Sequence, residues 1–173
     1  MQIKNSWILT ERQLCDCEMI LDGSFSPLNG FMVEKDYQSV LKTMRLVNGK
    51  LFTIPIVLDV NEQFSQKLNI DDEIALCDKE GFQIAEMMVE SIWKPDFEKE
   101  ADLIYGTSDR LHPGVNYLFQ HGNSIYVGGA IKKINVLLLV GSTYSLNNSF
   151  NASAIGCPIP RTPVLLGPMR ACI

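Results

Sequence analysis

Residues 23–32 read Gly23-Ser24-Phe25-Ser26-Pro27-Leu28-Asn29-Gly30-Phe31-Met32, a run of turn-forming residues and large apolar side chains. Pro27 fixes one backbone dihedral angle and Gly30 frees another, which is typical of a tight and defined loop. The four large apolar side chains favour a loop that folds back on the core. Because the stretch contains no acid or base, we interpret it as architecture: a rigid loop that fixes how this domain meets a neighbour.

Helical signals stand on both sides of this stretch. Thr10 and Gln13 have the spacing of a capping box, in which the threonine hydroxyl accepts from a backbone N–H and the glutamine reaches back. A helix over residues 11–21 is expected to follow, and Gly23 suits the left-handed position just past its end. Residues 34–46 place apolar side chains at helical spacing and predict a second helix.

The middle of the chain has the signals of β structure. Asn48-Gly49 is typical of a type I′ turn. Residues 51–60 are expected to form a strand buried on both faces, in which Pro55 indicates an edge position or a bulge. Further strands are expected at 73–77 and 82–93, joined by the loop 78–81, and at 124–134. Short helices are expected at 62–68, at 97–105 with Asp96 as its cap, and at 113–119 with Pro113 in its first turn. Together these elements indicate an α+β domain with a small mixed β-barrel and short flanking helices.

Composition and charge limit the classes of function. The 173 residues carry a net charge of −5 and have room for one domain with a proper core. Arg161 and Arg170 are the only charged residues beyond residue 135, so residues 1–135 hold 13 basic and 20 acidic side chains, a net charge of −7. A domain with this field does not attract nucleic acid or an anionic membrane. We therefore expect neither as a partner, and no RNA binding tighter than about 10⁻⁴ M at physiological salt.

The cellular compartment of the protein is predicted from its N-terminal residues and its cysteines. The first residues lack the apolar segment of a secretory signal, and the apolar run 136–140 is too short to span a bilayer. The five cysteines are odd in number and lack metal-site spacing, which indicates free thiols in a reducing, cytoplasmic compartment. They are Cys15, Cys17, Cys77, Cys157 and Cys172.

The stretch 23–32 is one of several blocks that occur in a defined order. Two blocks precede it, Leu9–Gln13 and Asp16–Glu18, and three come after it, Ile54–Val60, Gly106–Val115 and Tyr126–Gly129. In this order and at these separations, residues 7–135 resemble the N-terminal, PUA-like domain of ATP sulfurylase (sulfate adenylyltransferase). The resemblance implies a PUA-like fold over residues 1–135. The residues that carry the family signature, all interpreted as structural, are Gly23, Phe25, Ser26, Pro27, Leu28, Gly30, Phe31, Met32, Gly106, Thr107, His112, Pro113, Gly114, Gly128 and Gly129.

The family joins ATP and sulfate to make adenosine 5′-phosphosulfate and pyrophosphate, and this resemblance places that chemistry on a later domain. Its signatures, a Gln-x-Arg-Asn-Pro loop and a His-x-x-His pair, are absent from this sequence, where only His112 and His121 occur. We therefore expect no catalytic, cofactor-binding or metal-binding residue here, since ATP would bind the missing catalytic domain. The resemblance implies as partners a sulfurylase catalytic domain or like subunits.

Several residues that could take part in catalysis or ligand binding are better explained by a structural role. His112 is expected to cap or order the 106–114 loop rather than bind a ligand. Asp16 and Glu18 lie two apart on one helix, so they point to different faces and do not form a catalytic pair. Gly128-Gly129 has no helix N-terminus after it, which favours close backbone packing over phosphate binding.

Residues 136–173 form a divergent tail that is rich in Ser, Asn and Pro and has almost no charge. Its lack of apolar periodicity predicts an irregular, poorly ordered segment that is not a domain. Within it, Arg161-Thr162-Pro163 is only faintly similar to a segment that the family carries at its domain junction. The tail leaves open a truncated gene, an altered reading frame or a cloning remnant.

Two functional hypotheses of different classes remain. The first is an N-terminal domain of an ATP sulfurylase, truncated and inactive alone, that acts as scaffold and interface. The second is a free PUA-like binding module for RNA or a protein, which the net charge of −7 over residues 1–135 disfavours for RNA. A complete small enzyme is disfavoured further, since no catalytic constellation is found.

Overall fold

The computed structural model of the protein describes residues 5–134, so the expectations for the tail lie outside the described residues. In chain order its elements are β1 (Asn5–Ile8), α1 (Glu11–Leu21), β2 (Gly30–Phe31), α2 (Glu34–Thr43), β3 (Leu58–Val60), α3 (Glu62–Ser65), β4 (Glu73–Cys77), β5 (Gln83–Met88), β6 (Ser91–Trp93), α4 (Phe97–Tyr105), α5 (Pro113–His121) and β7 (Ile125–Lys133). Within residues 5–134 no helix is long and apolar enough to cross a membrane.

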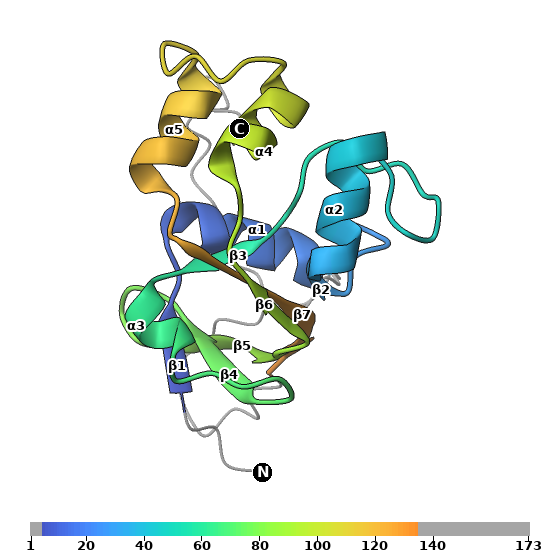
Figure 1. Cartoon of the computed structure of the whole chain (residues 1–173). Coiled ribbons are helices and arrows are strands. Elements are labelled where there is room, and N and C mark those ends of the chain that lie inside the picture. Colours follow the sequence, from blue (N-terminus) through green and yellow to red (C-terminus); the bar gives the residue numbers. More distant parts are fainter. Residues whose placement is uncertain (1–4, 135–173) are drawn as a thin grey trace, which may run out of the picture. The chain divides into compact units, whose positions relative to one another are not determined.

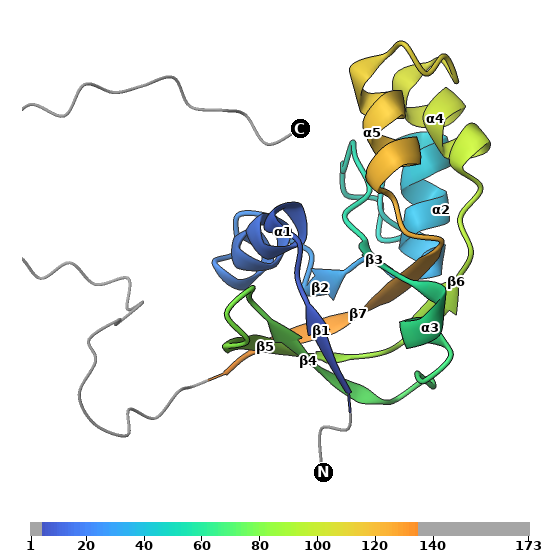
Figure 2. The same cartoon turned by 90° about the vertical axis from the view of Figure 1, so that its left-hand side faces the viewer.

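The sheet is organised around β7, which pairs antiparallel with four strands along its length. β3 and β6 pair with its first part, β2 with its middle and β5 with its end. β4 continues the sheet antiparallel to β5, and β1 joins β4 in parallel, so the sheet is mixed. Because one strand serves different partners along its length, the sheet curls into a half-barrel. In Figures 1 and 2, α1, α2, α4 and α5 lie above this sheet in the view. The predicted fold class is confirmed.

The helix ends follow from local chemistry that the sequence predicts. Thr10 Oγ1 accepts from the N–H of Gln13 at 3.3 Å, and the Gln13 side chain accepts from the N–H of Thr10 at 3.1 Å, which completes the capping box at α1. Gly23 has a φ of +85° just past the end of the helix. Asp96 caps α4 by accepting from Lys99, and Pro113 begins α5.

The end of α2 and the turn after it differ from expectation. The helix ends at Thr43 rather than residue 46, because Met44 adopts the left-handed conformation at a φ of 53°. Asn48-Gly49 does not form the expected type I′ turn, which requires positive φ at both residues. Only Gly49 has one, at +83°, and Asn48 instead accepts from the N–H of Lys50 through its side chain.

The expected strand over residues 51–60 is also shorter, since only β3 pairs in the sheet at its end. Pro55 has no N–H for a ladder, and the segment before β3 makes single bonds instead of a ladder. Phe52 donates to Met44 O, and Ile56 O accepts from Met32. The expected strand 82–93 divides into β5 and β6. Between them the N–H of Glu90 donates a hydrogen bond to Gly128 O of β7.

Two groups of buried side chains form the core. The larger group lies between α1 and the curled sheet and includes Phe31, Leu58 and Val127. The smaller group joins α2 to β6 and β7 through the rings of Tyr37 and Trp93, which are 5.5 Å apart between centroids.

Candidate functional site

The signature loop, residues 23–32, is held by its own backbone. Phe25 N–H donates to Met19 O of α1 at 3.1 Å, and Leu28 N–H donates to Phe25 O at 2.9 Å. The Ser26–Pro27 peptide bond is cis. The two hydrogen bonds hold the loop beside the end of α1, and the loop then leads into β2.

The apolar side chains of the loop point into the core. Phe31 is 2% exposed and lies in the larger core group, whereas Met32 lies in the smaller one. Phe25 and Leu28 are half-buried and pack against these groups. The loop therefore folds back on the core, as its composition predicts, and it also connects the two groups of the core.

Three signature glycines lie where backbones come too close for a side chain. A Cβ at Gly30 would meet Gly129 O of β7, one at Gly128 would meet Met32 O, and one at Gly129 would meet Met88 O. The expectation of close packing at Gly128-Gly129 is confirmed. The expectation that Gly30 uses a freed dihedral is wrong, since its φ is not positive. Contact with β7 is the reason that glycine is required there.

The second signature segment, Gly106–Gly114, connects α4 to α5. Gly106 ends α4 with a φ of +69°, and Thr107 Oγ1 accepts from the N–H of Asp109 at 3.1 Å. His112 makes no side-chain cap on α5; its ring instead lies 5.1 Å from the ring of Tyr105. A Cβ at Gly114 would also meet that tyrosine. The histidine therefore orders the loop by packing.

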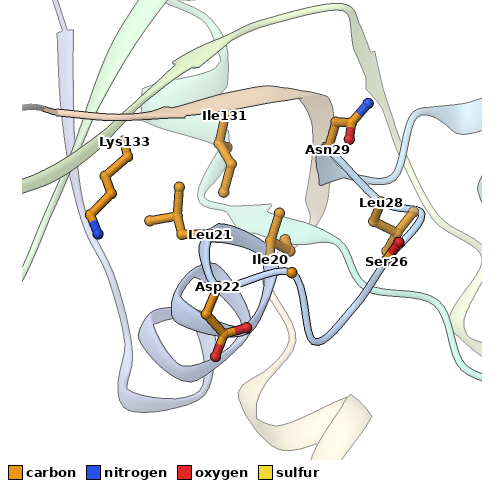
Figure 3. A pocket seen from close by; sticks show the side chains of 9 residues that line it. Ile20, Leu21, Asp22, Ser26, Leu28, Asn29, Ile131 and Lys133 are labelled. Carbon is orange, nitrogen blue, oxygen red and sulfur yellow. The ribbon is translucent and has the colours of Figure 1, made fainter. Parts of the chain in front are cut away.

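A hollow of about 540 Å³ lies between the end of α1, the signature loop and the end of β7. Figure 3 shows Leu21 and Ile131 between helix and strand, with Asp22 and Lys133 well separated at its edge. The hollow is lined by Ile20, Leu21, Asp22, Gly23, Ser26, Leu28, Asn29, Ile131 and Lys133. This set contains neither histidine nor cysteine, and its one acid, Asp22, accepts a hydrogen bond from the backbone N–H of Ser24.

Asp59 forms a buried polar centre that the sequence analysis did not predict. Its carboxylate, on β3, accepts from Arg12 Nη2 at 2.6 Å and Gln13 Nε2 at 2.7 Å, both on α1. The main-chain and side-chain N–H groups of Asn123, just before β7, complete it at 3.0 and 2.9 Å. The sequence does contain a feature that marks this residue, since Asp59 is the one charged residue within the apolar block 54–60.

Arg12 links this centre to Asp16, whose carboxylate it meets at 3.1 Å. Burial opposes the charge on the guanidinium, but the two carboxylates outweigh it and raise the pKa of Arg12. Burial also raises the pKa of Asp16. Glu18, two residues further along the same helix, is exposed.

Glu100, on α4, is a second buried carboxyl group. Tyr37 Oη of α2 donates to it at 2.8 Å and Tyr126 Oη of β7 donates at 3.1 Å. Burial raises the pKa of Glu100, while the two tyrosine hydrogen bonds and Arg12 oppose the rise. A signal was present here too, because Glu100 lies three residues after Phe97 on the apolar side of its helix.

The raised pKa of Glu100 predicts a pH dependence of stability. Folding favours the protonated carboxyl, so its contribution is full below the ordinary pKa of 4.5 and declines as pH rises through the higher folded pKa. The neutral Glu100→Gln variant should therefore gain stability relative to the parent as pH rises above 4.5. Urea unfolding from about pH 4 to pH 8 measures the difference. Glu98→Gln, on the exposed side of α4, is the control, and a pH-independent difference for Glu100→Gln would refute the assignment.

The chemistry available within residues 5–134 is limited. No group of three or more His, Cys, Asp or Glu side chains there could hold a metal ion. Burial raises the pKa of Cys17 to about 12, so this thiol is not a nucleophile at neutral pH. Each of the three arginines described has a separate partner: Arg12 meets two carboxylates, Arg45 donates to Gly49 O, and Arg110 lies over the Phe119 ring.

The profile of the PUA-like domain matches residues 2–136, so the chain belongs to the PUA-like domain family. Among curated relatives, the sulfate adenylyltransferase of Schizosaccharomyces pombe is 46% identical over 129 residues, 73% of this chain and 26% of that protein. That of Kluyveromyces lactis is 44% identical over 131 residues, 76% and 26% of the two chains, and that of Saccharomyces cerevisiae 45% over 130 residues, 75% and 25%.

The chain thus spans about a quarter of the length of these relatives. Among solved structures, a hexameric APS kinase from Thiobacillus denitrificans has a similar fold, with a TM-score of 0.56 and 22% identity over 75% of this chain and 21% of that one. The predicted resemblance of the chain to the N-terminal domain of ATP sulfurylase is confirmed.

Proposed function

We propose that this chain serves as a non-catalytic scaffold and interface domain of an ATP sulfurylase. The observation that carries this proposal is the position of the signature residues. Among them, Phe31 and Met32 fill the core, and Gly30, Gly128 and Gly129 allow backbones to meet. Residues that bound a nucleotide or an anion would instead present polar groups to an open site.

The engagement of the arginines supports the same conclusion. Attack of sulfate on the α-phosphorus of ATP joins two anions, so cationic and N–H donors must converge on the developing charge. The three described arginines point to separate partners and do not converge. ATP therefore belongs to a catalytic domain, and the partners of this chain are that domain or like subunits.

The alternative, a free RNA-binding module, has less support. The net charge of −7 over residues 1–135 is unfavourable for binding the RNA backbone, which is itself negatively charged. We propose a cytoplasmic location, which the free buried thiols of Cys17 and Cys77 support.

The proposal predicts that the purified chain releases no pyrophosphate from ATP in a sulfate-dependent manner. The reason is the lack of convergent cationic donors among its described residues. The assay compares the chain with the Schizosaccharomyces pombe enzyme as a positive control at matched molar concentration. Sulfate-dependent release that follows the chain through purification would refute the non-catalytic role.

A further inference from the structure

The last two residues of α2 and the loop that follows them, residues 42–54 together, carry an unusual set of exposed side chains, and we call this stretch the arm. Figure 1 shows it as the teal loop that leaves the body of the domain beside α2 and returns to β3. Within residues 5–134, ten large apolar side chains are exposed, and four of them belong to this short arm at 49–66% exposure. They are Met44, Val47, Leu51 and Ile54. Such a concentration of exposed apolar side chains marks an interaction surface.

The arm has a defined conformation. Leu46 N–H donates to Lys50 O at 2.9 Å, and Arg45 pairs with Leu51 in an isolated antiparallel bridge. Val47 N–H donates to the Asp36 carboxylate of α2 at 2.9 Å, which fixes the arm to the helix. Little conformational entropy would therefore be lost when a partner covers these side chains.

The charge of the arm is opposite to that of the rest of the domain. Lys42, Arg45 and Lys50 are exposed, and none of them forms an ion pair within residues 5–134. The arm contains no acid, so it carries a net charge of +3, whereas the remainder of residues 1–135 holds 10 basic and 20 acidic side chains, a net −10.

A complementary surface exists on the same domain, in the turn before β4. Ile70 is 52% exposed there and is followed directly by the exposed Asp71. The half-buried Asp72, whose carboxylate accepts from Asn69, and the half-buried Glu73 at the start of β4 add to its negative charge. This turn is apolar and acidic where the arm is apolar and basic. The exposed part of the arm has no aromatic ring for stacking on bases, since Phe52 is half-buried against Phe25.

From this complementarity we propose that the arm docks on the acidic turn 69–73 of a second copy of this chain. The contact is heterologous, with a different surface of each copy taking part. The inference deepens the proposed interface role by naming its surfaces. Its experiment measures mass rather than catalysis, so either proposal can fail without the other.

Sedimentation equilibrium of the full chain tests the contact. We expect association at low salt that weakens as ionic strength rises from about 0.01 to 0.15 M, because the Debye length falls from about 30 to 8 Å. Val47→Asp in the arm and Ile70→Lys in the turn should each weaken association at least about tenfold. Leu111→Asp and Leu111→Lys are the matched controls, since Leu111 is 89% exposed outside both surfaces. They should associate like the parent.

Mixing the two variants separates the possible contacts. Val47→Asp keeps an intact turn and Ile70→Lys keeps an intact arm, so an equimolar mixture should recover a heterodimer. No recovery would overturn the proposal, as would a monomeric parent or association that either variant leaves unchanged; unchanged association of Ile70→Lys alone would indicate arm-to-arm contact. Vesicles of phosphatidylcholine and phosphatidylserine, and a poly(U) RNA, are the remaining probes; arm-dependent binding to either by a monomeric parent would also overturn it.

Discussion

Asp59→Ala is expected to lower the free energy of unfolding by about 3–5 kcal/mol, because it leaves the Gln13 and Asn123 N–H groups without their carboxylate acceptor and removes one of the two carboxylates that pair with Arg12. Asp59 is 4% exposed and accepts hydrogen bonds from Arg12, Gln13 and Asn123. These donors come from α1 and from the segment before β7, so the carboxylate connects both to β3. A loss of this size is a large part of the stability of an ordinary domain, about 5–15 kcal/mol.

The measurement is urea unfolding of the variant beside the parent. The chain offers a matched control in the pair of Lys79 and Glu11, which has the same 2.6 Å separation as Arg12 and Asp59 but is exposed on both sides. Exposed pairs contribute little to stability, so Glu11→Ala should unfold at the midpoint of the parent. Equal midpoints for Asp59→Ala and Glu11→Ala would show that the buried centre contributes nothing.

Features that depend on near neighbours in sequence were predictable. The ends of α1, α4 and α5 follow from a capping box, the Asp96 cap and Pro113, each of which acts within about one turn of helix. Two features that involve distant segments, the mixed sheet and the close packing of Gly128-Gly129, were also predicted correctly, because turn signals and a glycine pair mark them locally.

The specific partners of buried polar side chains in distant segments were not predictable. The partners of Asp59 lie 46 to 64 residues away in sequence, and Tyr37 meets Glu100 across 63 residues. A lone acid in an apolar block marks such a residue as unusual, but its donors are set by the topology of the sheet. For the same reason, the requirement for glycine at position 30 was assigned to a dihedral angle when it comes from the backbone of β7.

The exposed features were also missed, because a hydrophobic pattern does not distinguish a buried apolar residue from an exposed one. Residues 51–60 are rich in apolar side chains and predicted one long buried strand. In the structure Leu51 and Ile54 are exposed on the arm, and only residues 55–60 are buried. Pro55 stands at this boundary, where the segment enters the core.

Phe31→Ala and Gly30→Val are expected to destabilise the fold strongly if the signature loop is architectural. Truncation of a buried phenylalanine costs about 3–5 kcal/mol through lost burial and the cavity that remains. Phe31 is 2% exposed in the larger core group, so the full effect applies. At Gly30 a side chain would meet Gly129 O, and overpacking of this kind costs about 1–3 kcal/mol or more while disrupting the β2–β7 pair.

The central claim is that the signature residues build the domain and do not contact a ligand. Unfolding midpoints of Phe31→Ala and Gly30→Val beside the parent test it most directly, with Phe82→Ala, which removes an exposed phenylalanine, as the control. The account predicts a clear decrease for both loop variants and none for the control. Midpoints equal to that of the parent for both loop variants would contradict it, because a surface loop that only binds a ligand can lose these side chains without loss of stability.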